Sequence, residues 1–221
     1  MPGGIGIFGG TFDPVHLGHL RAAEDVREAL ELAEIRFVPA AVPPHKDAQT
    51  VTAPAARLRM LELATEGVPG FRVWPVELER QGLSYSVDTI RALRAEVGDA
   101  RPIAFVLGRD AFAEFDTWKE YTTIFTLCDV VVITRPPQRE AMTMADIPVA
   151  ARGAFCYDSA SGSFHHESGH RVIPLSVVSL DISATDIRAR LAAGRSIRFL
   201  VPAAVEAYLE STRLYRPAHA S

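Results

Sequence analysis

Two histidines near the start of the chain have the type and spacing to bind phosphate. His16 and His19 flank Gly18 and follow the stretch Gly9-Gly10-Thr11-Phe12-Asp13. An imidazole N–H can donate a hydrogen bond to a phosphate oxygen, and glycine lets the backbone approach a ligand closely. The stretch therefore predicts a binding site for an anion such as a nucleotide phosphate.

The neighbouring residues predict the elements that would position this site. A short apolar run, Ile5 to Phe8, ends at the glycine pair, and the chain turns through Asp13-Pro14. Apolar residues then recur at helical spacing at Leu17, Leu20, Ala23, Val26 and Leu30. We expect a strand, a loop and a helix, which bring backbone N–H groups and the positive end of the helix dipole to one place.

Three simpler interpretations explain the stretch less well. Gly4-x-Gly6-x-x-Gly9 has the spacing of a dinucleotide-binding fingerprint, but its first two glycines fall inside the apolar run. His16 and His19 could ligate a metal, yet no glutamate accompanies them as in a zinc-hydrolase helix. An ordinary turn does not explain why the glycines, Asp13 and both histidines occur together here. Because the histidines lack an accompanying glutamate, we predict no protein-bound metal.

The motif Gly-Gly-Thr-Phe-Asp-Pro-x-His-x-Gly-His, residues 9–19, resembles the signature of the nucleotidyltransferases that carry an HxGH motif. In that superfamily the two histidines contact the phosphates of the nucleoside triphosphate. The resemblance implies that His16 and His19 are catalytic and bind ATP. The ATP-binding residues implied beside them are Gly9, Gly10, Thr11 and Phe12.

A second motif near the end of the chain predicts another helix start. Ser183 with Asp186 three residues later is typical of a capping box. Thr185 and Arg188 would lie in the first turns, where a guanidinium and the helix dipole together favour an anion. The pattern Ile-Ser-x-Thr-x-Ile-Arg resembles the second superfamily signature, with Ala184 where Ser is frequent. It implies that Ser183, Thr185 and Arg188 bind ATP, and that Arg188 is catalytic.

Two central stretches resemble one branch, the bacterial nicotinate-nucleotide adenylyltransferases. The run Pro43-Pro44-His45-Lys46 resembles that branch's triphosphate-facing loop and implies that Lys46 contacts phosphate, although a rigid surface loop would also explain it. In the branch, backbone groups of a Ser-Tyr turn hold the pyridine ring and its carboxylate, which implies this role for Tyr85 and Ser86. Ser86 stands where the branch commonly has Thr, and we expect it to be the N-cap of the next helix.

The continuous apolar run Pro102 to Leu107 predicts a strand buried on both faces. Gly108 follows it and permits close approach, while Asp110 could bind ribose hydroxyls, help hold hydrated Mg2+ or cap a helix. We assign both to ATP. Trp118 is expected at the start of another helix, either in the core or, as in the resembling branch, stacked on the nicotinate ring. We also assign Arg135 to the nicotinate nucleotide.

The remaining polar segments carry weaker signals. His165, His166 and His170 lie among Gly and Ser residues, which favours a mobile polar loop over 162–170 and not a metal site. Cys128 and Cys156 are too few for a disulfide framework, so we expect reduced thiols, Cys128 in the core and Cys156 in a loop.

Composition narrows the class of protein. The chain has 221 residues, 48% of them hydrophobic and 23% charged, enough to bury a sizeable core. Its net charge of -4 argues against a nucleic-acid groove, and neither a membrane span nor a secretion signal is recognisable. We expect a cytoplasmic enzyme with no nucleic-acid or membrane partner, and a homo-oligomer is compatible with the sequence.

Strands alternate with helices along the whole chain, which predicts an α/β fold, doubly wound around a mostly parallel sheet. We expect one domain over residues 1–221, with 183–221 as a small C-terminal helical subdomain. The resemblance implies that this is the Rossmann-like nucleotidyltransferase fold.

The expected reaction joins nicotinate mononucleotide to the AMP part of ATP, giving deamido-NAD and pyrophosphate in NAD biosynthesis, with Mg2+ on the triphosphate. The nearest alternatives are nicotinamide-mononucleotide and pantetheine-phosphate adenylyltransferases. An oxidoreductase is disfavoured because Ala40 and Ala41 stand where an acidic ribose-binding residue is expected. A catalytically silent nucleotide-binding regulator is disfavoured because both histidines and Arg188 are present.

Overall fold

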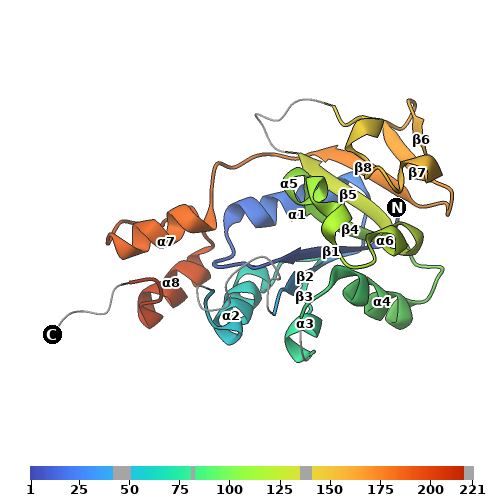
Figure 1. Ribbon diagram of the computed structural model, residues 1–221. Helices are drawn as coiled ribbons and strands as arrows, with labels where there is room; N and C mark the ends of the chain where they lie inside the picture. Colours follow the sequence, from blue (N-terminus) through green and yellow to red (C-terminus); the bar gives the residue numbers. More distant parts are fainter. Residues whose placement is uncertain (42–50, 81–82, 135–140, 217–221) are drawn as a thin grey trace.

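One eight-stranded sheet, in the order β3-β2-β1-β4-β5-β8-β7-β6, forms the centre of the computed structural model (Figure 1). The structure describes residues 1–41, 51–80, 83–134 and 141–216. The strands are β1 (Ile5–Gly10), β2 (Glu34–Pro39), β3 (Phe71–Val73), β4 (Ile103–Gly108), β5 (Asp129–Thr134), β6 (Phe155–Asp158), β7 (Ser163–His166) and β8 (Arg171–Ser176).

The helices are α1 (Leu17–Ala29), α2 (Pro54–Thr65), α3 (Val76–Glu79), α4 (Ser86–Val97), α5 (Arg109–Ala113), α6 (Tyr121–Leu127), α7 (Ala184–Ala192) and α8 (Ala203–Thr212). The described residues also contain three single turns of 3-10 helix, namely η2 (Phe115–Thr117), η3 (Met144–Asp146) and η4 (Arg152–Ala154). None of these helices is long and apolar enough to cross a membrane, judged on the described residues.

The sheet has the topology that places a ligand crevice at its middle. Strands β1 to β5 and β8 run parallel to one another. Strand β7 pairs antiparallel with β8 on one side and with β6 on the other. The chain moves outward from β1 through β2 to β3, and then crosses to β4 on the other side of β1. The carboxyl ends of β1 and β4 therefore diverge into a crevice. This arrangement confirms the predicted doubly wound α/β fold.

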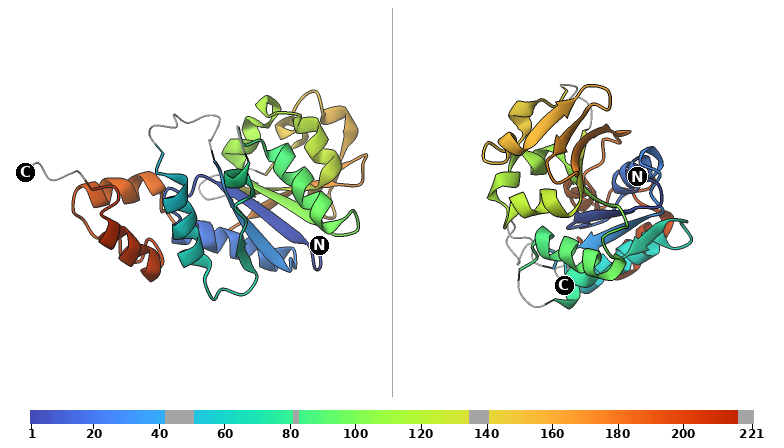
Figure 2. Two further views of the ribbon diagram at one scale, coloured as in Figure 1. Left: turned by 90° about the horizontal axis from the view of Figure 1, so that it is seen from below. Right: turned by 90° about the vertical axis from the view of Figure 1, so that its right-hand side faces the viewer.

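Helices cover both faces of the sheet, as Figure 2 shows. On one face, α1 and α2 pack around Phe8 and Phe37, and on the other α4 and α6 pack around Ile7 and Phe105. All five residues from Ile103 to Leu107 are buried, which confirms the prediction of a strand covered on both sides. The helices α7 and α8 lie beyond the carboxyl end of β1 (Figure 1), and their apolar residues join the first of these clusters. Their role as a separate subdomain over 183–221 stays a prediction.

The prediction of a mobile loop over residues 162–170 is wrong. This segment contains β7, which pairs with β6 and β8, and its Phe164 is completely buried. Cys156 lies on β6 and not in a loop, while Cys128 is buried as expected. This four-residue strand contains one apolar residue, Phe164, and so carries too little pattern to be distinguished from a polar loop.

A buried carboxylate, that of Asp129, holds the start of β8 and the turn before it against the start of β5. Asp129 begins β5, and its Oδ2 accepts a hydrogen bond from Arg171 Nη2 at 2.8 Å, while its Oδ1 lies 3.4 Å from His170 Nδ1. Burial alone would raise the pKa of Asp129, but the hydrogen bonds from His170 and Arg171 and the charge of Arg171 outweigh burial and lower it. The ionised carboxylate therefore stabilises the fold.

We predict that Asp129→Asn lowers the free energy of unfolding by about 1 to 3 kcal/mol near neutral pH, because charge-assisted hydrogen bonds are lost. The pKa of Asp129 is lower in the folded than in the unfolded chain. Its stabilising effect is thus complete above the unfolded pKa and disappears as the pH falls through the folded one. Urea denaturation at several pH values measures the difference, with the exposed Asp99→Asn as control. A difference that grows toward acid pH would contradict this account.

Candidate active site

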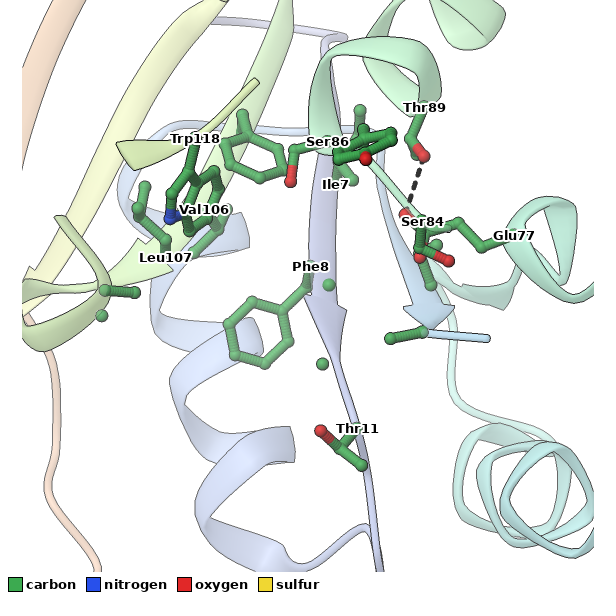
Figure 3. A pocket seen from close by; sticks show the side chains of 18 of the residues that line it. Ile7, Phe8, Thr11, Glu77, Ser84, Ser86, Thr89, Val106, Leu107 and Trp118 are labelled. Carbon is green, nitrogen blue, oxygen red and sulfur yellow. Dashed lines mark hydrogen bonds between the residues drawn. The ribbon is translucent and has the colours of Figure 1, made fainter. Parts of the chain in front are cut away.

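A cavity of about 740 Å³ opens at the diverging ends of β1 and β4. In the view of Figure 3, Trp118 and Ser86 lie near one end of it and Thr11 near the other. It brings together many of the predicted site residues, namely Gly9, Gly10, Thr11, His19, Tyr85, Ser86, Gly108, Asp110 and Trp118. The predicted residues that do not line it are Phe12, His16, Ser183, Thr185 and Arg188. Lys46 and Arg135 lie outside the described residues.

The two histidines form a stacked pair at the start of α1. Their ring centroids are 3.7 Å apart, and the backbone N–H of His16 donates to Nδ1 of His19 at 3.3 Å. Because Nδ1 accepts this bond, a neutral His19 carries its ring proton on Nε2, which can donate to a ligand. Phe12 packs against the edge of the His19 ring, with centroids 5.2 Å apart. The imidazole that faces the cavity is therefore held from two sides.

Glycines leave the space that this pair and a ligand require. A Cβ atom added at Gly18 would lie 3.1 Å from the His16 ring, so a larger residue would disturb the stack. At Gly9, an added Cβ would meet no protein atom within 4 Å, although the residue lines the cavity. The room above Gly9 is thus open to a ligand at the end of β1.

A buried arginine holds the loops beneath the cavity, and the sequence analysis missed it. Arg57 is completely buried, and its guanidinium donates to the carbonyl oxygens of Thr11 and Ala40, both at 2.8 Å, and of Thr52 at 2.9 Å. Burial lowers the pKa of Arg57, and the nearby charge of Asp13 opposes that effect. No pattern in the sequence distinguishes this arginine from an exposed one on the same helix. The next residue, Leu58, is only half-buried because Arg57 takes the inner position.

The second motif reaches the first through Arg188. Its Nη1 donates to the carbonyl oxygen of Asp13 at 2.7 Å, and its Nη2 donates to the Thr185 hydroxyl at 3.3 Å. Ser183 caps α7 by accepting from the backbone N–H of Asp186 at 3.0 Å. The reciprocal half of the predicted capping box is replaced, because the Asp186 carboxylate pairs with Arg190 at 2.6 Å. Arg188 therefore lies against the loop that precedes the histidines.

The turn around Tyr85 is held from below by a buried glutamate, which the sequence analysis also missed. Glu77 Oε1 accepts from the Thr89 hydroxyl at 2.7 Å, as Figure 3 shows, and the Ser84 hydroxyl accepts from the backbone N–H of Ala41 at 3.2 Å. Burial raises the pKa of Glu77, and its hydrogen bonds with Thr89 and Ser84 oppose this shift. Tyr85, and not Ser86, is the N-cap of α4, so the predicted cap is one residue too late.

The first N–H groups of α4 have no partner within the helix and lie beside the cavity. Aromatic packing fixes the facing wall. The Trp118 ring lies 5.0 Å from that of Phe115 and 6.1 Å from that of Phe105. Trp118 follows η2 and precedes α6, so it does not start a helix as predicted. Lys119 extends over the Tyr85 ring, with its Nζ 4.6 Å from the centroid. The cavity thus has an aromatic, partly cationic end opposite the histidine end.

A family profile and the sequences of related proteins assign this chain to the same family. The cytidylyltransferase-like family profile matches residues 7–190. A protein of Geobacter sp. (strain M21) named probable nicotinate-nucleotide adenylyltransferase is 46% identical over 96% of this chain and 97% of its own length. One of Geotalea uraniireducens with the same name is 43% identical over 97% of this chain and 99% of its own.

Among solved structures, the nicotinic acid mononucleotide adenylyltransferase of Plasmodium falciparum complexed with NaAD has a similar fold. Its TM-score is 0.69 at 16% identity, over 96% of this chain and 97% of that one. This likeness supports the same fold, while the sequence identities above carry the family assignment. The chain belongs to the cytidylyltransferase-like family and, within it, to the nicotinate-nucleotide adenylyltransferases.

Proposed function

We propose that this enzyme transfers the adenylyl group of ATP to nicotinate mononucleotide, forming deamido-NAD and pyrophosphate. The observation that carries the proposal is the two-ended cavity, which combines the glycine loop and His19 with an aromatic wall and a helix start. The names of the full-length relatives support the same reaction. A pyrophosphate-release assay with ATP and a panel of phosphate acceptors tests it, and activity with another acceptor alone would overturn it.

The histidine end would bind ATP. His19 can donate from Nε2 into the cavity, and the open space at Gly9 lets phosphate oxygens approach the backbone. Arg188 and the start of α7 lie against the same loop and would contribute positive charge. The residues that we assign to ATP are Gly9, Gly10, Thr11, Phe12, His16, His19, Lys46, Gly108, Asp110, Ser183, Thr185 and Arg188.

Adenylyl transfer to a phosphate requires stabilisation of negative charge and does not require a general base. The phosphate of the acceptor is already anionic when it attacks the α-phosphorus of ATP, and the bond to pyrophosphate breaks. Negative charge increases on the α-phosphoryl oxygens and on the leaving group. Imidazole and guanidinium N–H groups held in advance by protein contacts lower the barrier without rearranging. His16, His19 and Arg188 would supply them.

The aromatic end would bind the pyridine ring. Trp118 would stack on the ring, while N–H groups at the start of α4, near Tyr85 and Ser86, would donate to its carboxylate. Arg135 is assigned to the same nucleotide. We further propose that the enzyme acts in the cytoplasm, where both nucleotides occur, and that residues 183–221 form a subdomain beside the ATP site.

Mg2+ is proposed to arrive with ATP. Mg2+ prefers oxygen ligands, and the side chains assigned to the triphosphate are mainly imidazole, hydroxyl and guanidinium groups. No cluster of three or more metal-ligating side chains occurs within the described ranges. The donor set therefore fits a metal held by the phosphate oxygens of the substrate.

We predict that His19→Ala lowers kcat by about two orders of magnitude, because a donor to the developing phosphoryl charge is removed. Steady-state pyrophosphate release measures the loss, and circular dichroism checks the fold. His165→Ala, on β7 outside the cavity, is the matched control. Near-normal turnover of the His19 variant would exclude this histidine from the mechanism.

Removing the metal should abolish activity reversibly. Excess chelator should stop pyrophosphate release, and added Mg2+ should restore it, because the metal would neutralise the triphosphate. Elemental analysis of the purified protein should find no stoichiometric zinc. Tightly bound zinc at His16 and His19, or at His165, His166 and His170, would contradict our assignment.

Nicotinate mononucleotide should be preferred over nicotinamide mononucleotide by at least about tenfold in kcat/KM. An amide presents N–H groups to the donors of the helix start, and a lost charge-assisted bond typically costs about 1.5 to 3 kcal/mol. A competition assay with both mononucleotides in one reaction measures the ratio of their kcat/KM values. Equal efficiency would favour a nicotinamide-type enzyme.

Trp118→Ala should damage the use of both mononucleotides more than it weakens ATP binding, because the stacking surface for the pyridine ring is lost. Trp74→Ala, which removes a tryptophan that does not line the cavity, is the control. Unchanged kcat/KM for the acid in the Trp118 variant would contradict this assignment.

A further inference from the structure

The loop between β1 and α1 is held in an unfavourable backbone conformation. Phe12 has a φ of +49° although it carries a large side chain that is almost completely buried. A residue other than glycine adopts this left-handed region rarely, and it persists only where the surrounding contacts enforce it. On one side of Phe12, Arg57 binds the carbonyl oxygen of Thr11. The contacts on the other side of Phe12 involve the C-terminal segment.

Asp13 is the residue through which that segment acts. Its carboxylate is buried, and Oδ2 accepts from the backbone N–H of Thr52 at 3.2 Å. Its Oδ1 accepts from the hydroxyl of Tyr215, a residue 202 positions away in the sequence. The Asp13 carbonyl oxygen accepts from Arg188. The residue after the strained Phe12 is therefore bound by α7, by the segment before α2 and by the C-terminal segment at once.

The C-terminal segment turns back sharply to make this contact. Arg213 and Tyr215 both have positive φ values, +55° and +66°, and Leu214 and Tyr215 pack against the core cluster that contains Phe12. Burial and the hydrogen bond to Asp13 both raise the pKa of Tyr215, so its hydroxyl stays protonated and acts as the donor. Tyr215 does not line the cavity. Any effect of Tyr215 on a ligand there must pass through other residues.

We propose that Tyr215 is a positioning residue for the triphosphate site, acting through Asp13 to hold Phe12 and the start of α1 so that Thr11 and His19 face the ATP phosphates. The Phe12 ring carries the effect further, because it packs against the His19 ring. The inference rests on the proposed function in that the ligand at this end is taken to be ATP.

Tyr215→Phe tests the proposal because it removes the hydroxyl and keeps the ring that packs in the core. We expect kcat/KM for ATP to fall about tenfold, the order expected for one hydrogen bond to a buried carboxylate. The Kd of an ATP analogue with a methylene bridge between the α- and β-phosphorus should rise, while the KM for nicotinate mononucleotide should change little. The Tm should also fall, because a hydrogen bond to a buried carboxylate is lost, so the analogue Kd and not the Tm decides the proposal. Tyr208→Phe is the matched control, since Tyr208 packs on the same cluster and its hydroxyl has no hydrogen-bond partner among the described residues.

Two further results would overturn the proposal. A lower Tm with unchanged ATP kinetics and unchanged analogue Kd would show that Tyr215 only stabilises the fold. Additive losses when Tyr215→Phe is combined with Asp13→Asn would show that it does not act through Asp13, because residues in one pathway should be non-additive. If the wild-type enzyme rejects nicotinate mononucleotide, the proposed function fails, while the analogue Kd still decides this inference because it needs no acceptor.

Discussion

The architecture of the site depends on one buried positive charge. Arg57 binds carbonyl oxygens of the loops that follow β1 and β2 and of the segment before α2, so these three pieces of backbone share a single partner. A buried guanidinium is costly unless its N–H groups are satisfied, and here they meet carbonyl oxygens close to the carboxylate of Asp13. The loops at the carboxyl ends of adjacent strands therefore cannot move independently. The histidine end of the cavity, which we assign to ATP, has a rigid base as a result.

The two ends of the cavity differ in the charged groups that surround them. A protein with a net charge of -4 that binds two anionic nucleotides must gather its positive groups locally. At one end, Arg188 and helix starts would supply positive charge beside the imidazole donors of the histidine pair. At the other end Glu77 lies beneath the turn that we assign to the pyridine carboxylate, and two ionised carboxylates there would repel each other. Burial raises the pKa of Glu77, and the hydrogen bonds with Thr89 and Ser84 and the charge of Arg80 oppose that shift.

The parts of the fold that could be predicted are those in which local pattern and tertiary position agree. The apolar run of β4 falls at the predicted residues because a strand covered on both faces contains little else. The glycine loop and the capped start of α7 were also recognisable, since each has its own local chemistry. Arg57, Glu77 and Tyr215 were not, because nothing beside them in the chain marks their partners. These partners lie up to 46 residues away for Arg57, 12 for Glu77 and 202 for Tyr215. The β6–β7 hairpin was missed because β7 contains one apolar residue, Phe164, which is too few to show the pattern of a strand.

This distribution of contacts explains why the binding machinery requires the complete fold. Residues 9–19 supply the phosphate loop, but its strained conformation at Phe12 is enforced by α2, by α7 and by Tyr215 near the other end of the chain. None of these contacts is available to the isolated strand-loop-helix unit, in which the left-handed Phe12 would relax to a more favourable conformation. The motif is thus the local part of a site whose geometry is set by long-range contacts. The conformation of the HxGH loop therefore depends on tertiary contacts as much as on the residues of the motif itself.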